Sequence, residues 1–146
     1  MRWLILGIGL LTCSVNAAEY LAARAHSNYQ IYCQGCHGPD GSGAGDVPRM
    51  LGHVGSFQLS AAGREYVVRV PGSATSALSN ERLAEVLNWI VYEFSGDSFV
   101  AAFEPYTAEE VGRLRASPLN ETVNTRAAIL AELAAREELD QGDDQR

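Results

Sequence analysis

The sequence predicts an all-α protein, on three observations. The segment 80–94 has the strongest helical periodicity in the chain, and the segments 18–32 and 126–139 are rich in alanine and other helix-forming residues. No segment alternates polar and apolar residues as a half-buried strand does. At 146 residues, of which 47% are hydrophobic and 20% charged, the chain has the size and composition of one small globular domain.

The first two expected helices lie between residues 18 and 70. Helical spacing places four residues of the segment 18–32 on one face, namely Leu21, Ala25, Tyr29 and Tyr32. Ser60 is a suitable N-cap for a helix over 60–70, and the segment 71–76, which begins Pro-Gly, breaks it. The inward residues of this second helix should be Tyr66, Val67 and Val70.

The later helices have clear start signals. Ser79 caps the helix over 80–94, whose apolar stripe consists of Leu83, Val86, Leu87, Ile90 and Phe94. Thr107 and Glu110 form a capping box that opens a short helix, which Ser117-Pro118 ends. A further helix is expected over 126–139, followed by a charged and frayed tail over 140–146.

The first 17 residues have the pattern of a signal peptide. Arg2 precedes a short apolar run, and small residues close to Ala17 suit a signal peptidase. The run is too short to span a bilayer comfortably, so a retained anchor is the weaker alternative. Cys13 is a lipid attachment point only in a minority interpretation, because Thr12 is not the small residue expected before such a cysteine.

The segment Cys33-Gln34-Gly35-Cys36-His37 carries the strongest chemical signal. Two cysteines three apart, with a histidine directly after the second, form the attachment pattern for c-type haem. Each thiol adds to one vinyl group of the porphyrin, and the adjacent imidazole is then placed over the iron. We therefore expect one covalently attached haem c, with Cys33 and Cys36 as tethers and His37 as the proximal iron ligand.

Three other interpretations of this motif are weaker. A thioredoxin-like dithiol would follow a strand and open a helix, whereas here a helix precedes the motif and a glycine-rich loop follows it. A zinc site needs four ligands, and only His26 and His53 remain to complete one. A structural disulfide between the two cysteines is the third alternative. Export to an oxidising compartment, where disulfides persist, agrees with haem attachment to thiols.

One residue after the glycine-rich loop and one on a later helix are candidates for a place beside the haem or its ligand. The neighbourhood of Pro48 can offer a carbonyl to the Nδ1 proton of His37, the bond that fixes the orientation of a ligating histidine. Trp89 could cover a haem edge, although packing between helices is the favoured interpretation.

Together these residues resemble class I cytochrome c. The resemblance rests on a helix that ends Tyr29-x-x-x-Cys33, the attachment motif followed by Gly38, the pattern Pro48-x-Met50-x-Gly52, and a helix that runs from Leu78-Ser79-Asn80-Glu81 to Trp89-Ile90. It implies a cytochrome c-like fold of three to four helices around one haem, in which the first and last helices cross. Ala25 and Tyr29 would then meet Val86, Trp89 and Ile90.

The resemblance covers residues 18–94 and suggests how the chain is divided. We expect a signal peptide over 1–17, a cytochrome c domain over 18–98, and a helical C-terminal extension over 99–146. The extension lies outside the resemblance.

The sixth iron ligand departs from the family pattern. The family usually has a methionine followed by proline in the loop before the last helix, and Val70-Pro71 stands there in this chain. The resemblance puts Met50 at a position that packs on the haem. Three possibilities stay open: an open or water-filled sixth position, ligation by Met50, or ligation by His53 or another side chain. A thioether raises the reduction potential, whereas an empty position admits small ligands.

The charge of the chain limits its partners. The sequence has no lysine, and removal of residues 1–17 leaves 10 basic and 18 acidic residues, a net charge of −8. This composition excludes docking through a lysine ring, makes nucleic acid an improbable partner, and favours a redox partner with a basic face. Several acids lie in the extension: Glu109, Glu110, Glu132, Glu137, Glu138, Asp143 and Asp144. The plain alternative is that they solvate helix faces.

The expected function is one-electron transfer in the periplasm, between a periplasmic dehydrogenase and a downstream acceptor. No constellation of catalytic acid, base or nucleophile is visible, so we expect a carrier and not an enzyme. One alternative is a five-coordinate haem protein that binds or senses NO, CO or peroxide. The other is a haem subunit held in a stable dehydrogenase complex by residues 99–146. Integration into a membrane is not expected.

Overall fold

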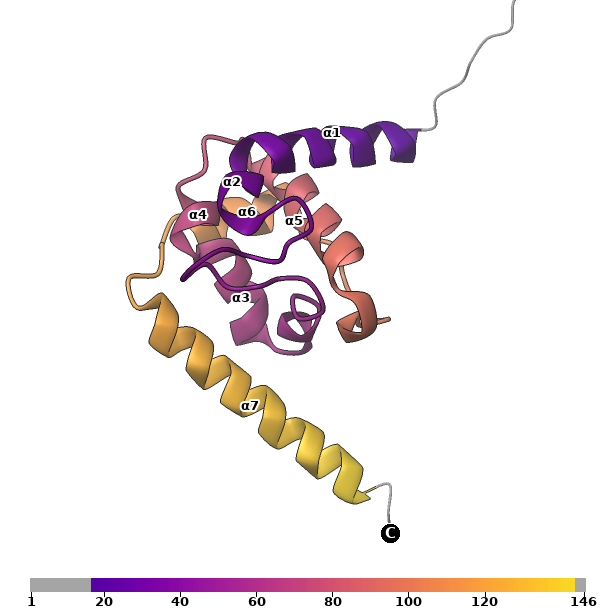
Figure 1. Cartoon of the computed structure of the whole chain (residues 1–146), viewed down its shortest axis with the longest axis vertical. Helices are drawn as coiled ribbons and strands as arrows, with labels where there is room; N and C mark the ends of the chain where they lie inside the picture. The colour runs from indigo at the N-terminus through magenta and orange to yellow at the C-terminus, as the bar shows by residue number, and fades with distance from the viewer. Residues whose placement is uncertain (1–16, 144–146) are drawn as a thin grey trace, which may run out of the picture.

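The computed structural model describes residues 17–143, with side chains for residues 21–138. The expected signal peptide, Cys13 included, lies outside the described residues except for Ala17. The elements are, in order, α1 (Ala17–Tyr32), α2 (Gln34–His37), η1 (Ser56–Leu59), α3 (Ala61–Arg69), α4 (Pro71–Ala74), α5 (Asn80–Phe94), η2 (Gly96–Ser98), α6 (Ala108–Arg115) and α7 (Thr122–Asp143). Within this part of the chain the only β-structure is an isolated bridge between Ala44 and Val47, so the all-α prediction is confirmed (Figure 1).

The three predicted N-caps are present. The side-chain oxygen of Ser60 accepts a hydrogen bond from the backbone of Gly63 at 3.0 Å, and that of Ser79 accepts one from Arg82 at 3.2 Å. Thr107 accepts one from the backbone of Glu110 at 3.1 Å. Each cap satisfies a backbone N–H that the first turn of a helix leaves without a partner, which stabilises a helix by about 1 kcal/mol.

Two helix boundaries differ from the prediction. The segment 71–76 was expected to be irregular, but Pro71 takes the first position of the short helix α4, where its missing N–H costs nothing. The break falls at Val70, which has extended ψ of 143°. Helix α7 begins at Thr122 and continues to Asp143, so it takes in residues on both sides of the expected 126–139.

The core forms where α1 crosses α5 (Figure 1). Ala25 and Tyr29 are 2% and 0% exposed on α1, and Val86 and Ile90 are 0% and 4% exposed on α5. The half-buried Trp89 stacks against His26 and packs at a tilt against Tyr29, with 5.1 Å between ring centroids in both pairs. The resemblance implied this crossing, and Trp89 packs between helices as favoured.

The segment that follows α5 packs on the same core. Tyr106, Val111 and Leu114 are buried in one cluster with Tyr29 and the apolar face of α5. Burial of a large apolar side chain contributes about 1.5–3 kcal/mol. Residues from the expected extension therefore share the hydrophobic core of the cytochrome-like part.

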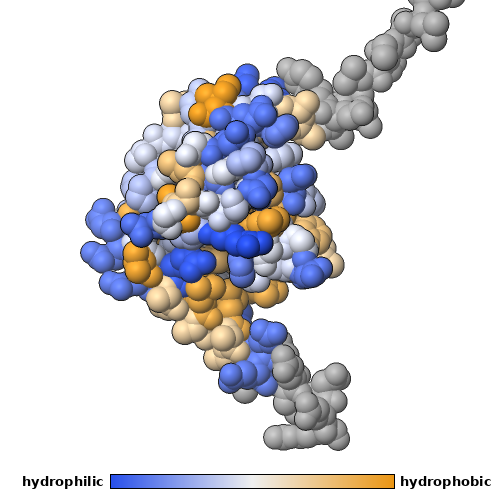
Figure 2. All heavy atoms as spheres, viewed as in Figure 1, coloured by the Kyte–Doolittle hydropathy of each residue, from blue (hydrophilic) through white to orange (hydrophobic). Residues whose placement is uncertain are grey.

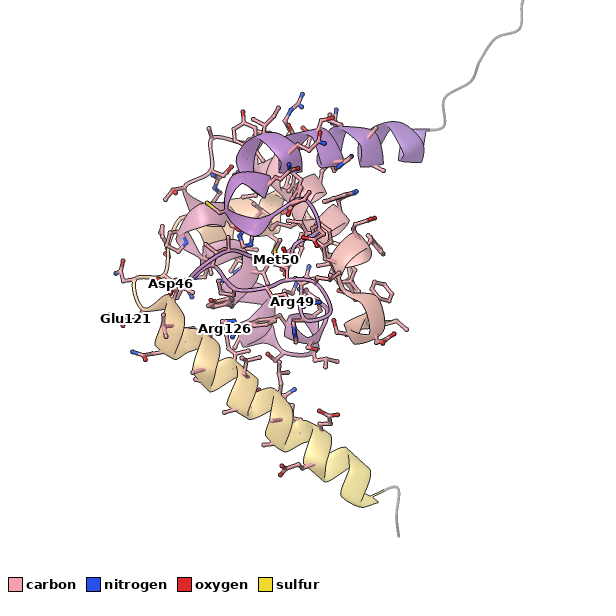
Figure 3. The ribbon with its side chains drawn as sticks, in the orientation of Figure 1. Asp46, Arg49, Met50, Glu121 and Arg126 are labelled. Atoms are coloured by element: carbon pink, nitrogen blue, oxygen red, sulfur yellow. The ribbon has the colours of Figure 1, made fainter. Side chains whose placement is uncertain are left out.

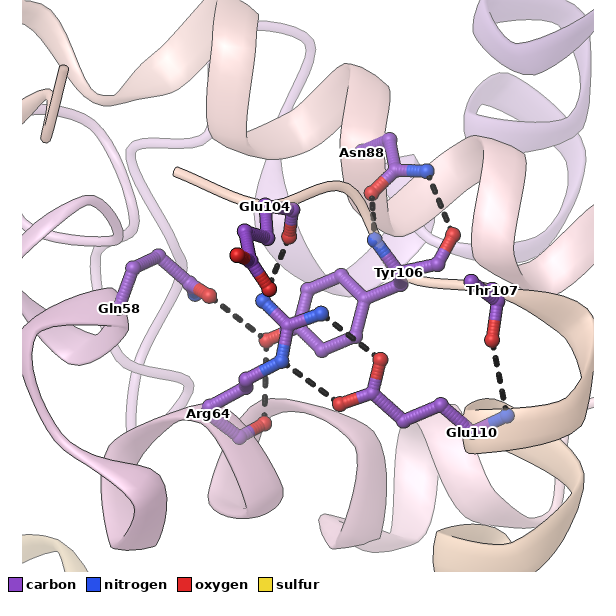
Figure 4. Close-up of polar contacts among 7 residues, drawn as sticks. All are labelled: Gln58, Arg64, Asn88, Glu104, Tyr106, Thr107 and Glu110. Carbon is purple, nitrogen blue, oxygen red and sulfur yellow. Dashed lines mark hydrogen bonds and ion pairs between the residues drawn. The ribbon is translucent and has the colours of Figure 1, made fainter. Parts of the chain in front are cut away.

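Hydrogen bonds fix Tyr106 in place (Figure 4). The side-chain amide of Asn88 exchanges two bonds with the backbone of Tyr106, at 2.7 and 3.0 Å. The Tyr106 hydroxyl lies 3.0 Å from the side-chain oxygen of Gln58 and from the carbonyl oxygen of Arg64. Arg64 in turn binds both carboxylate oxygens of Glu110, at 2.6 and 2.7 Å.

Helix α7 lies along α3 and η1, and its C-terminal half extends beyond the rest of the molecule (Figure 1). The Leu119 amide donates to the Arg69 carbonyl at 2.9 Å, just before α7 begins. Further along, Arg136 donates to the carbonyl of Leu59 at 3.3 Å, and Ile129 is buried. The helix is therefore attached to the molecule at two points.

Candidate functional site

A cavity of about 710 Å³ lies between α2, the segment 46–57, α3, α4, α5 and α7. Its lining is mostly apolar, and its size falls within the range of about 300–1,000 Å³ that is usual for ligand sites. Figure 2 shows apolar side chains along α7, the helix that supplies one of the cavity walls. The cavity can hold a large apolar molecule.

The two cysteines of the motif and the histidine after them line this cavity together. The carbonyl of Cys33 accepts hydrogen bonds from the amides of Cys36 and His37, at 3.1 and 3.0 Å, which winds the motif into the single turn α2. Cys33 is half-buried, Cys36 is exposed, and the two thiols are free. Burial, followed by the neighbouring Cys36, raises the pKa of Cys33 to about 11.

His37 is half-buried, and burial lowers its pKa, which favours the neutral imidazole that can bind a metal. Its Nδ1 atom is buried and has no hydrogen bond of good geometry within the described residues. A weaker interaction with the backbone of Pro48 raises the pKa of the ring. An iron-bound histidine needs an acceptor for its second nitrogen, and Pro48 stands where that acceptor was expected.

The loop after His37 folds back against the motif. The buried Tyr29 hydroxyl donates to the carbonyl of Gly38 at 2.5 Å, and the amide of Gly43 donates to the carbonyl of His37 at 2.9 Å. Gly43 has φ of +76°, and a Cβ there would lie 2.4 Å from the carbonyl oxygen of Val47. Only glycine fits this position without displacing the backbone.

Of the two candidates for the sixth ligand, the structure brings one into the cavity. Met50 is half-buried against the core and lines the cavity, as does Pro48. Its amide donates to the carbonyl of Gly41 at 2.8 Å, so Met50 belongs to the folded loop that follows His37. His53 is exposed and is not part of the cavity lining. Its placement gives no support to ligation by His53.

The α3–α4 corner supplies another part of the lining. Tyr66, Val67 and Val70 are half-buried there and face the cavity, as expected from the sequence, whereas the deepest α3 residue is Val68, at 0% exposed. The ring of Tyr66 stacks on Phe57 with centroids 5.5 Å apart.

Helix α7 supplies a wall that the sequence analysis did not assign to the site. Val123, Arg126, Ala127 and Leu130 all line the cavity. Val123, Ala127 and Leu130 follow the i, i+4, i+7 spacing of one helix face, a signal that could have revealed an apolar face on this segment. Their exposure, 79% for Val123 and 37% for Leu130, leaves that face open to a bound molecule.

Two further findings concern the described residues. Across residues 17–143, no group of three or more His, Cys, Asp or Glu side chains is placed to hold a metal ion, so a zinc site has no support there. In the same part of the chain no helix has both the length and the hydropathy to cross a bilayer. The apolar cavity, the adjacent thiols and the buried Nδ1 of His37 fit a haem.

Similarity to known proteins agrees with this fit. No family model matches the chain. A protein from Thermus thermophilus, named cytochrome c-552, is 33% identical over 138 residues, which cover 82% of this chain and 86% of the relative. Another cytochrome c-552 from Thermus thermophilus is 35% identical over 106 residues, which cover 60% of this chain and 81% of that relative. The chain belongs to the c-type cytochromes.

Proposed function

We propose that this protein is a one-electron carrier with a single haem c, tethered by Cys33 and Cys36 and ligated by His37. The observation that carries the proposal is that these three side chains line one apolar cavity. When bound, the haem would supply the redox chemistry, the reversible uptake of one electron.

The residues of the chain bind, orient and shield the haem. His37 holds the iron, with the backbone of Pro48 as the partner of its Nδ1 proton. The apolar lining excludes water and lowers the local dielectric, which helps to set the reduction potential. Met50, which lines the cavity from the loop that follows His37, would pack on the haem.

The place of action that we propose is the periplasm, reached through removal of residues 1–17. The donor would be a periplasmic dehydrogenase and the acceptor a downstream redox protein. Glu109, Glu132, Glu137 and Glu138 are exposed, and the sequence has no lysine, so a basic face on the partner would match this surface. Electron-transfer contacts are small, so docking needs no large apolar patch.

The test is expression of the full chain together with a c-type haem attachment machinery. The natural protein should gain the mass of one haem, retain it after denaturation, and show a haem c spectrum. Replacing both cysteines by alanine should abolish covalent attachment, and His37→Ala should abolish normal ligation. His53→Ala, at an exposed residue off the cavity, is the matched control and should keep the natural spectrum. A colourless product with two alkylatable thiols would refute the proposal.

Binding of a small ligand such as NO or CO is a second candidate function. The cavity lining contributed by α3 and α4 has hydroxyl and aliphatic groups but no thioether or imidazole. Because this part of the lining offers the iron no methionine or histidine, it favours a sixth position that is open to a small ligand. Met50 belongs to the loop that folds back on His37. Rapid binding of CO to the ferrous protein would support this function. Slow CO binding in the natural protein that becomes rapid in Met50→Ala would instead assign Met50 as the sixth ligand.

A further inference from the structure

Arg126 is a positive charge in the wall of the cavity. It lies on α7, is half-buried, and has its guanidinium 5.8 Å from the centroid of the Phe57 ring. Figure 3 shows Arg126 on the side of α7 that faces α3. The other α7 residues in this wall, Thr122, Val123, Ala127 and Leu130, are uncharged.

Arg126 lacks the partners that the other half-buried arginines have. Arg64 pairs with Glu110, and Arg69 pairs with Glu65. Among the described side chains Arg115 has no carboxylate partner either, but its guanidinium donates to the backbone carbonyls of Ala74, Ser76 and Leu78. Arg126 forms no ion pair with any side chain in the described range 21–138. A charge that is partly removed from water is costly without a counter-charge.

The second arginine of the cavity lining is in a different situation. Arg49 is exposed, so water solvates its charge, and its Nε donates to the carbonyl of Leu51 at 2.9 Å. Of the two arginines in the cavity lining, Arg126 therefore depends more on a bound anion to neutralise its charge.

A hydroxyl group accompanies Arg126. Tyr66 also lines the cavity and stacks on Phe57, so Arg126 and Tyr66 both contact the same ring. Burial raises the pKa of Tyr66, while the charge of Arg126 opposes this rise. A guanidinium and a phenol O–H are both donors, and donors of this kind bind carboxylates.

We propose that Arg126 and Tyr66 form a subsite for a carboxylate within the cavity. The inference rests on the proposed function, because a haem brings two propionate carboxylates with it. A small free carboxylate such as acetate is the other source of the same chemistry. In a chain with a formal net charge of −7, a half-buried cation that faces the cavity gives a local preference for an anionic group.

The test compares the holoprotein with Arg126→Gln and Arg126→Lys. The midpoint potential is measured from pH 5 to 8, with and without acetate, and the propionate bending bands are followed by resonance Raman spectroscopy. Arg126→Gln should lower the equilibrium constant for reduction about tenfold, which is about 59 mV for a one-electron couple. The reason is that loss of a nearby positive charge favours the ferric iron. Arg126→Lys should restore most of the potential.

Arg113→Gln is the matched control, because it removes an exposed arginine that does not line the cavity. It should leave the potential and the propionate bands unchanged. Tyr66→Phe removes only the hydroxyl and should shift the propionate bands without a change in charge, which keeps the proposal testable if Arg126→Gln does not fold.

The outcomes distinguish the two carboxylate sources. Shifted propionate bands without acetate assign the subsite to the haem, and an effect that requires acetate assigns it to a free carboxylate. The inference is overturned if Arg126→Gln and Tyr66→Phe both keep the midpoint potential and the propionate bands of the natural protein, with and without acetate. Absence of any haem spectrum in the natural protein would instead be a failure of the proposed function.

Discussion

The hydroxyl of Tyr29 donates a 2.5 Å hydrogen bond to the backbone carbonyl of Gly38, the residue directly after His37. Tyr29 is fully buried between α1 and α5, where its ring lies 5.1 Å from Trp89 and 5.3 Å from Phe94. Burial is the main cause that raises the pKa of Tyr29 to about 12, so the hydroxyl keeps its proton at neutral pH. The helix crossing is thereby joined to the loop that holds the candidate iron ligand.

Tyr29→Phe should destabilise the protein by about 1–2 kcal/mol, because the Gly38 carbonyl loses a partly buried partner while the ring packing is kept. Urea unfolding of the holoprotein, followed by circular dichroism, measures the change. Tyr92→Phe removes a hydroxyl from a ring that is 57% exposed and does not line the cavity, and it should leave stability within about 0.5 kcal/mol. Equal stability of Tyr29→Phe and the natural protein would show that the Gly38 bond contributes nothing.

Gly43→Ala should destabilise the loop after the motif by at least about 2 kcal/mol. The added Cβ would lie 2.4 Å from the Val47 carbonyl oxygen, at a positive φ that alanine avoids. Gly45→Ala is the matched control, since Gly45 also has positive φ but open space around its Cβ position. Thermal unfolding should therefore rank Gly43→Ala clearly below Gly45→Ala, and the opposite order would contradict the structure.

Acid should weaken the contact between α3 and α6. The Arg64 side chain holds the pKa of Glu110 below its ordinary value of 4.5. A carboxyl whose pKa is lower in the folded state contributes stability above the unfolded pKa, and this contribution is lost as pH falls through the folded pKa. Glu110→Gln should thus reduce the loss of stability between pH 7 and 3 in urea unfolding. The exposed neighbour Glu109, changed to Gln, should keep the natural pH profile.

Removal of α7 should expose the cavity without removing the attachment motif. A chain that ends at Asn120 keeps the bond between Leu119 and Arg69 but lacks the wall formed by Val123, Ala127 and Leu130. Because more water would then be near the iron, the reduction potential of the holoprotein should fall. The rate of CO binding to the ferrous protein should stay the same or rise. Voltammetry checks the first point and flash photolysis the second. An unchanged potential would mean that α7 shields nothing.

The sequence was sufficient for the starts of three helices and for the full extent of α5. Ser60, Ser79 and Thr107 act as local caps whose partners lie three residues away, so their role is visible without knowledge of the fold. The helix over 80–94 was predicted with its observed bounds because its apolar stripe is long and regular.

The parts that the sequence did not predict depend on contacts between distant segments. Arg126 lies 60 positions after Tyr66, and only the packing of α7 along α3 brings both into one cavity. Pro71 was expected to interrupt helical structure, and its favourable role as the first residue of α4 is set by the direction of the chain after α3. The exposure of His53 likewise follows from the path of its loop and from no local pattern.

The wall formed by α7 has a consequence for how the molecule is assembled. This helix begins at Thr122, 86 positions after Cys36, the second of the cysteines that would receive the haem. While α7 is not packed against α3, the cavity lacks one side, so a bulky planar molecule could enter there. Docking of α7 after attachment would then close the cavity around its occupant.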